Sequence, residues 1–180
     1  MAPIPFVNNS LVWITFLSNI LLLYIIIELI YYKLNRKHLF EGVVDILRGK
    51  EMFWMFLVSL VAMLGSLYYS EIAGYNPCTL CWYQRIFMYS QVFILGLASF
   101  RKDKKVMPYI YLLSAIGLLI AVYHYIMQLS QVDSVFCELV GYSASCSETF
   151  FLSMGYITIP LMAASAFLLI ILLGVLRGRN

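Results

Sequence analysis

Five long apolar stretches, separated by short polar segments, dominate the pattern of this chain. A helix needs about 20 apolar residues to cross the hydrocarbon core of a bilayer, and such runs favour a helical bundle over a membrane β-barrel, whose strands alternate. The sequence therefore predicts an all-α membrane protein with five spanning helices. The third stretch is the shortest, and it reaches spanning length only if residues 82–85 belong to the same helix. The expected ranges are 11–32, 52–70, 86–100, 107–128 and 154–176.

Basic residues show which ends of these helices face the cytoplasm, because Lys and Arg are enriched in cytoplasmic loops. With the N-terminus outside, 11 of the 12 Lys and Arg residues fall on the inner side, and only Arg85 is left outside. The first stretch has its positive charges after it, so we expect an anchor and not a cleaved signal peptide. We also expect an amphipathic helix at the membrane surface within 33–51.

Composition excludes several classes of protein. With 63% hydrophobic and 12% charged residues, the chain is not a soluble globular domain. Its net charge of +3 comes from cytoplasmic anchoring residues, so it indicates contact with membrane lipid and not with nucleic acid. We expect two parts: residues 1–51, with an outer tail, an extra helix and a basic loop, and residues 52–180, a four-helix domain.

All four cysteines lie outside the apolar stretches, in two pairs: Cys78 with Cys81, and Cys137 with Cys146. Both pairs fall on the outer side, where disulfides persist. Cys81 is expected in the first helical turn, where the helix N-terminus favours an anion, and Arg85 lies one turn further along the same face. The pattern therefore predicts thiol–disulfide chemistry with a reactive Cys81 thiolate.

Other interpretations of the cysteines remain open from the residues alone. The Cys-x-x-Cys could be a redox-inactive structural disulfide, or half of a zinc site completed by Cys137 and Cys146. The spacing of that second pair and the oxidising compartment count against zinc, and we expect no metal. The second pair could also be a purely structural staple, although this leaves the Cys-x-x-Cys beside Arg85 unexplained.

Arg85 and His124 are polar groups that are costly to bury at membrane depth. His124 lies late in the fourth stretch, at about the level of Arg85. Together they could polarise the carbonyl oxygens of a membrane quinone and donate protons to it, although Arg85 could also reach the headgroups and His124 could bond a carbonyl. Trp82 and Tyr83 are typical of the membrane interface, and their position beside the thiol makes a role in binding a ring possible.

At these residues the chain resembles the DsbB/BdbC family of bacterial disulfide bond formation proteins. The resemblance covers about 52–176 and rests on four features in order. They are Cys78-Thr79-Leu80-Cys81-Trp82-Tyr83-Gln84-Arg85-Ile86, then His124, then the pair Cys137 and Cys146, then Gly155-Tyr156-Ile157-Thr158-Ile159-Pro160.

The resemblance implies a four-helix bundle of the inner membrane, with the cysteines on its periplasmic side. Such a protein reoxidises a DsbA-like periplasmic thioredoxin-fold protein and passes two electrons to ubiquinone or menaquinone. Carried over to this chain, the partner would attack Cys137, Cys146 would attack Cys78, and Cys81 would emerge as the thiolate beside the quinone, with Arg85 and His124 close by. This chain differs from the usual pattern of the family in two ways. The spacing from Cys137 to Cys146 is short, and the first helix is additional to the four-helix core.

Three alternatives stay open, two of them redox proteins and one a protein without catalytic activity. Vitamin K epoxide reductases share the chemistry, but their loop pair precedes the Cys-x-x-Cys, whereas here it follows. A non-catalytic membrane scaffold with two structural disulfides would need neither quinone nor a reactive thiolate. A relay that sends electrons outward would need thiols on the cytoplasmic side or within the membrane, and this chain has none outside the outer loops.

Overall fold

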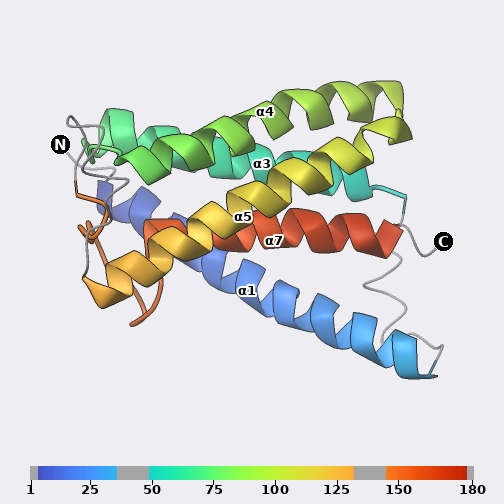
Figure 1. Cartoon of the computed structure of the whole chain (residues 1–180), viewed down its shortest axis with the longest axis horizontal. Helices are drawn as coiled ribbons and strands as arrows, with labels where there is room; N and C mark the ends of the chain where they lie inside the picture. The colour runs from blue at the N-terminus through green and yellow to red at the C-terminus, as the bar shows by residue number, and fades with distance from the viewer. Residues whose placement is uncertain (1–3, 36–48, 132–144, 178–180) are drawn as a thin grey trace.

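The structure is a computed structural model that describes residues 4–35, 49–131 and 145–177. Within these ranges the chain forms five α-helices, which run roughly along the long axis of the molecule (Figure 1). The helices are α1 (Ile4–Asn35), α3 (Glu51–Leu67), α4 (Thr79–Arg101), α5 (Met107–Ser130) and α7 (Ile159–Arg177). Two short turns accompany them, the π-helical η1 (Tyr68–Ile72) and the 3₁₀-helical η2 (Lys104–Val106).

Four of the described helices are long and apolar enough to cross a membrane, and they lie within α1, α3 with η1, η2 with α5, and α7. α4 is more polar, because it contains Gln84, Arg85 and Gln91. Its 23 residues nevertheless extend about 34 Å at 1.5 Å per residue, and it packs against both α3 and α5. Residues 82–85 belong to α4, which is the condition under which the third stretch was expected to reach spanning length. We therefore treat all five helices as membrane-spanning.

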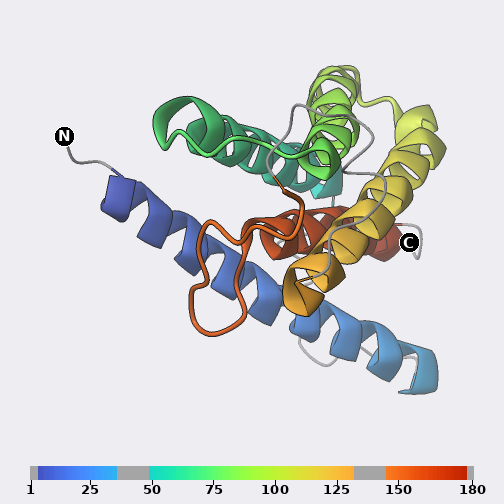
Figure 2. The ribbon, with the colours of Figure 1, turned by 60° about the vertical axis from the view of Figure 1, so that its left-hand side comes forward.

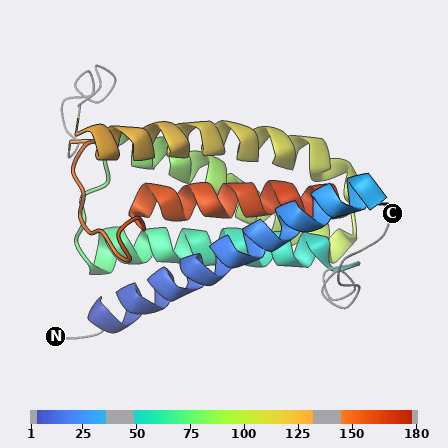
Figure 3. The same cartoon turned by 90° about the horizontal axis from the view of Figure 1, so that it is seen from below.

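α7 forms the centre of the bundle and packs against α1, α3 and α5 (Figure 2). Phe167, Ile170 and Leu173 of this helix are almost fully buried. At the crossing with α5, Gly117 leaves the space that the ring of Phe167 occupies. α1 differs from the other helices in direction, since it crosses the bundle obliquely (Figure 3). The four helices from α3 to α7 thus form a compact unit with α1 laid across it.

Both described cysteine-bearing segments lie at one end of the bundle. Residues 73–81 and 145–158 meet there, close to the start of α1, and we call this the cysteine end (Figure 1). The basic turn at 101–106 lies at the opposite end, near the end of α7. This grouping is the one that the charge pattern predicts, although which side of a membrane each end faces stays a prediction.

The last helix begins later than the sequence predicts. We expected it from residue 154, but α7 starts at Ile159. Met154 and Gly155 have positive φ angles of 52° and 77°, and Ser153 pairs with Ile157 in an isolated antiparallel bridge. Two successive residues in the left-handed region cannot continue a right-handed helix. Apolar composition alone does not reveal this turn.

The amphipathic helix expected within 33–51 falls mostly on residues 36–48, which lie outside the described residues. Residues 33–35 continue α1, and residue 51 begins α3. The remaining helices match their expected positions but are longer at one or both ends, notably α1, which starts at residue 4 and not at 11.

Candidate active site

The Cys-x-x-Cys is held by the start of α4. Cys78 is the N-cap residue, with an extended backbone (φ −73°, ψ 171°). Its sulfur accepts a hydrogen bond from the backbone N–H of Cys81 at 3.4 Å. Pro77, immediately before it, has no N–H and fixes its own φ. The cap therefore directs the sulfur of Cys78 back over the first turn of α4, toward Cys81.

Cys78 and Cys81 form a close dithiol. Their sulfur atoms are 3.2 Å apart, well beyond the roughly 2.05 Å of a disulfide bond, and both residues are free cysteines. Cys78 is only 2% exposed, whereas Cys81 is half-buried. The pair is therefore in its reduced form, close enough to share one proton.

His124 comes from α5 and completes this cluster. It is 2% exposed, and its Nε2 lies 3.5 Å from Cys78 Sγ. On the other side of the ring, its Nδ1 lies 3.0 Å from Nε2 of Gln84 on α4. When the Gln84 amide donates to Nδ1, the proton of a neutral ring resides on Nε2 and faces Cys78. The structure thus places His124 beside the first cysteine of the pair.

These contacts change the acidity of Cys78, which precedes the first residue of α4. The hydrogen bond between the two cysteine sulfurs, added to by the hydrogen bond with His124 and opposed by burial, lowers the pKa of Cys78 to about 4. An ordinary cysteine thiol titrates at about 8.5. In the reduced pair the negative charge therefore resides on Cys78, and not on Cys81 as the position of Arg85 suggested.

A titration of the reduced protein should show this thiolate directly. In a variant with Cys137 and Cys146 replaced by serine, the ultraviolet absorbance of one thiolate should persist from pH 8 to pH 5. It should fall as the pH drops through about 4, because protonation then removes the charge. His124→Ala should move this step to higher pH, and Cys78→Ser should remove it. Loss of all thiolate absorbance near the ordinary value of about 8.5 would contradict the assignment.

Arg85 lies one turn after Cys81 and is almost buried, at 9% exposure. Its Nε donates to Ser66 Oγ and its Nη2 to the Ser66 carbonyl oxygen, both at 3.0 Å. Its guanidinium also lies over the ring of Trp82, 5.1 Å from the ring centroid. Two bonds to one residue of α3 and a ring contact fix the cation beside the dithiol, where it adds positive charge.

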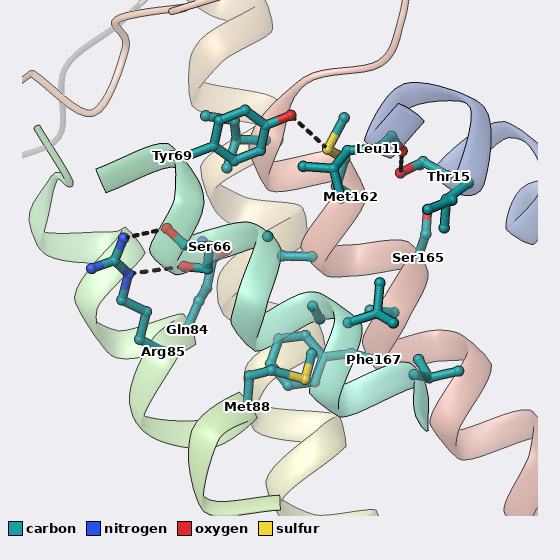
Figure 4. A pocket seen from close by; sticks show the side chains of 18 of the residues that line it. Leu11, Thr15, Ser66, Tyr69, Gln84, Arg85, Met88, Met162, Ser165 and Phe167 are labelled. Atoms are coloured by element: carbon teal, nitrogen blue, oxygen red, sulfur yellow. Dashed lines mark hydrogen bonds between the residues drawn. The ribbon is translucent and has the colours of Figure 1, made fainter. Parts of the chain in front are cut away.

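A cavity of about 340 Å³ opens between α1, α3, α4 and α7. Gln84 and Arg85 line it from α4, and Ser66 lines it from α3 (Figure 4). Cys81 of α4 also belongs to the lining. Apolar side chains supply most of the remaining surface. Of the four residues predicted to bind a cofactor, the described lining includes Arg85 but not His124, Trp82 or Tyr83.

The other predicted positions are spread around the cysteine end. Trp82 and Tyr83 are 54% and 46% exposed on the outer face of α4. Cys146 is fully buried and disulfide-bonded, and it shares one small cluster with Cys78, Leu80 and Met127. Cys137 lies outside the described residues. The cluster brings the second pair, through Cys146, next to the Cys-x-x-Cys.

The site also contains a possible set of metal ligands. The sulfurs of Cys78 and Cys81 and a ring nitrogen of His124 all lie within 4.8 Å of one another. Soft sulfur and imidazole ligands of this kind suit zinc. This set differs from the four-cysteine site considered from the sequence. The expectation that the site works without a metal stays a prediction.

Comparison with known proteins bears on this arrangement. A family model described as "Disulfide bond formation protein DsbB" matches residues 50–176. The chain belongs to the DsbB family. The resemblance inferred from the sequence is thereby confirmed over almost the same range, and so is the all-α membrane bundle of DsbB type. The match includes α3, α4, α5 and α7, whereas α1 lies outside it.

Several curated relatives carry related names. The chain is 46% identical to SPbeta prophage-derived disulfide bond formation protein B of Bacillus subtilis (strain 168) over 120 residues, or 67% of this chain and 80% of that protein. Disulfide bond formation protein C of the same strain is 46% identical over 116 residues, 64% of this chain and 83% of the relative. Probable disulfide formation protein C of Halalkalibacterium halodurans is 40% identical over 129 residues, which are 72% of this chain and 93% of that protein. No solved structure matches the chain.

Membership of the DsbB family supports a role in disulfide bond formation by a membrane oxidoreductase. The individual roles of the site residues stay predictions, as does the boundary between residues 51 and 52. Sequence reasoning did not single out Ser66 or Gln84, which bond Arg85 and His124. A polar residue at i+3 from Cys81 was a usable signal for Gln84. For Ser66 the only signal in the sequence was its position near the outer end of an apolar stretch.

Proposed function

We propose that this chain is a thiol:quinone oxidoreductase of the bacterial cytoplasmic membrane that reoxidises a DsbA-like thioredoxin-fold protein. The position of Cys81 carries the proposal. Its sulfur lies 3.2 Å from Cys78 Sγ, and its side chain lines the cavity. Cys81 therefore adjoins both the thiol of Cys78 and a space large enough for an electron acceptor.

The cavity fits a quinone in its chemistry. Its end beside Cys81 carries hydrogen-bonding groups of Ser66, Gln84 and Arg85, and the rest of its lining is mainly apolar. Two further lining residues, Trp54 and Tyr89, have a buried Nε1 and a buried hydroxyl with no hydrogen-bond partner among the described residues. A quinone has polar oxygens on its ring and an apolar chain, and when bound it supplies a two-electron acceptor. Ser66, Gln84 and Arg85 would hold the ring.

In the proposed relay, the partner's thiolate attacks Cys137 of a Cys137–Cys146 disulfide. Cys146 is released and attacks Cys78 of an oxidised Cys78–Cys81 pair, so that Cys81 leaves as a thiolate. The partner's second thiol then attacks the mixed disulfide, which releases Cys137, and the Cys137–Cys146 bond re-forms as Cys146 leaves Cys78. The partner has gained a disulfide, and the reduced Cys78–Cys81 pair holds its two electrons, together with the one proton that the two sulfurs share. The burial of Cys146 in one cluster with Cys78 supports this exchange.

Two basic side chains assist the Cys-x-x-Cys in this scheme. Arg85 supplies positive charge at the polar end of the cavity, where Ser66 holds it in place. His124 acts on the other side of the pair and keeps Cys78 in the thiolate form, the reactive form of a cysteine. Closure of the Cys78–Cys81 bond then releases two electrons toward the cavity. His124 therefore acts on the sulfur, and not on the quinone as its level in the membrane suggested.

The sidedness of the protein is part of the proposal. The cysteine end faces the outside, the basic turn at 101–106 faces the cytoplasm, and α1 begins outside. The charge pattern of the sequence supports this orientation. So does the disulfide at Cys146, because disulfides persist in oxidising compartments.

A reconstituted assay tests the function. Purified protein in detergent is mixed with quinone and a reduced thioredoxin-fold dithiol protein, and the ultraviolet absorbance of the quinone is followed. We expect quinone loss with one disulfide formed in the partner per quinone consumed. Ubiquinone and menaquinone analogues are tested separately.

The same assay can contradict the proposal. No quinone loss with several reduced partners and both quinones, from protein whose helical content is intact, would favour a membrane scaffold with two structural disulfides. Quinone loss without disulfide formation in the partner would show that the electrons come from elsewhere.

A further inference from the structure

α1 lies outside the segment that matches the DsbB family, yet it forms one wall of the cavity. Each residue of α1 that lines it has another lining residue three or four positions away, so together they form a single stripe along the helix. They are Leu11, Ile14, Thr15, Ser18 and Leu21. The opposite face of α1 is exposed, with Trp13, Leu17 and Ile20 at 56%, 60% and 50%. One face of α1 thus belongs to the cavity and the other to lipid.

Polar bonds hold α1 in this orientation. Tyr69 on η1 donates its hydroxyl to Asn8 Oδ1 at 2.9 Å, and Ser165 on α7 donates to Asn19 Oδ1 at 2.7 Å. These two bonds lie 11 residues apart on α1 and flank most of the lining stripe. Hydrogen bonds between helices in a membrane fix how the helices are rotated against each other. α1 is therefore a fitted part of the bundle and not a loose anchor.

The cavity extends from the cysteine end along most of the length of α3. Along α3 its lining runs from Ser66 to Trp54, a distance of about 18 Å at 1.5 Å per residue. This length exceeds what a single six-membered ring occupies beside Cys81. Ile14 lines the cavity and is also 46% exposed, so it lies at a rim where the cavity meets lipid. A ring held near Arg85 would leave its hydrocarbon chain against α1.

We infer that α1 is the wall that holds the hydrocarbon chain of the electron acceptor, with Thr15 and Ser18 setting the width available to it. The inference rests on the proposed function. Both side chains are small, and the Thr15 hydroxyl is already donated to the Leu11 carbonyl oxygen at 2.9 Å (Figure 4). The stripe therefore offers a narrow apolar surface. A larger side chain at residue 18 would close the path of the chain without touching the dithiol.

Ser18→Phe tests this inference, and Leu17→Phe is its matched control. Both variants add a ring to the same turn of α1, but residue 17 faces lipid and residue 18 faces the cavity. In Ser18→Phe we expect the KM for a long-chain quinone to rise about tenfold, which corresponds to about 1.4 kcal/mol. The KM for a quinone with the same ring and no chain, and kcat with both quinones, should stay at wild-type values. Leu17→Phe should match wild type throughout.

Binding is measured separately from activity. A benzoquinone that carries a photoreactive diazirine at the end of a long alkyl chain is bound to the protein, and labelled peptides are mapped by mass spectrometry. We expect label on the stripe of α1 in wild type and in Leu17→Phe, and its loss from α1 in Ser18→Phe. Ser18→Leu provides a smaller change, should Ser18→Phe fail to insert or fold.

Three results would overturn the inference. They are equal KM changes for the two quinones in a folded residue 18 variant, unchanged KM for both, and label confined to helices other than α1. The proposed function fails differently, because wild type itself would then reduce no quinone. Label on α1 in a protein without quinone reduction would keep the binding wall and overturn the function alone.

Discussion

Replacing Cys81 by serine should abolish quinone reduction and leave the bundle intact. Cys81 is the cysteine that both adjoins Cys78 Sγ at 3.2 Å and lines the cavity. A hydroxyl cannot form the disulfide whose closure releases the electrons. Loss of a residue that bonds covalently during turnover costs about a thousandfold or more in rate. The change is small in volume, so helical content and the unfolding temperature should remain near those of wild type.

The same variant should also reveal the order of the relay. Without Cys81 there is no Cys78–Cys81 disulfide for Cys146 to attack, so added reduced partner should only reduce the Cys137–Cys146 disulfide. The partner should gain one disulfide per molecule of this protein, and the reaction should then stop with the Cys137–Cys146 bond lost. Peptide mapping under non-reducing conditions detects this loss. Ile86→Ser is the control, because it places a serine further along α4 at a side chain that is 57% exposed, and it should retain turnover. Normal quinone reduction by Cys81→Ser would contradict the mechanism.

Gly117→Ala should destabilise the bundle by about 1–3 kcal/mol, the cost typical of overpacking a filled core. A Cβ at residue 117 would overlap the ring of Phe167, which is fully buried and cannot swing into solvent. α5 and α7 would have to move apart at their crossing. Unfolding in detergent by heat or denaturant measures the effect.

Two further variants separate overpacking from a general effect of alanine. Gly117→Ala combined with Phe167→Leu should recover part of the lost stability, because the shorter side chain leaves room for the methyl group. Gly96→Ala should cost less, since its nearest neighbour is the partly buried ring of Phe56 at 3.2 Å. An unchanged unfolding free energy in Gly117→Ala would mean that the two helices are not as close as described.

The helices were predictable because each depends on a local property, the apolar length of one segment. The Cys-x-x-Cys with Arg85 was predictable for the same reason, since all three residues lie within eight positions of one another. The turn at Met154 and Gly155 was not, because apolar residues continue through it and only the backbone angles reveal it.

Contacts between residues far apart in the chain could not be predicted from a single sequence. Arg85 bonds Ser66, which is 19 positions away, and His124 meets Cys78 across 46 positions. Both depend on how α3, α4 and α5 are rotated against one another. The sequence position of His124 predicted a level close to that of Arg85, but it did not show that the ring contacts the dithiol and does not line the cavity. The cavity itself was unforeseen, since no single segment encodes it.

The four walls of the cavity also have a consequence for the order in which the protein is made. Synthesis proceeds from the N-terminus, so α1, α3 and α4 exist before α7, which supplies Met162, Ala163 and Ser165 to the lining. A nascent chain that ends before residue 159 already carries the dithiol, but it has no enclosed space beside Cys81. Residues 145–158, with Cys146, also arrive late. The newly made thiols therefore lack the cavity that we propose for the electron acceptor until the last helix has been made.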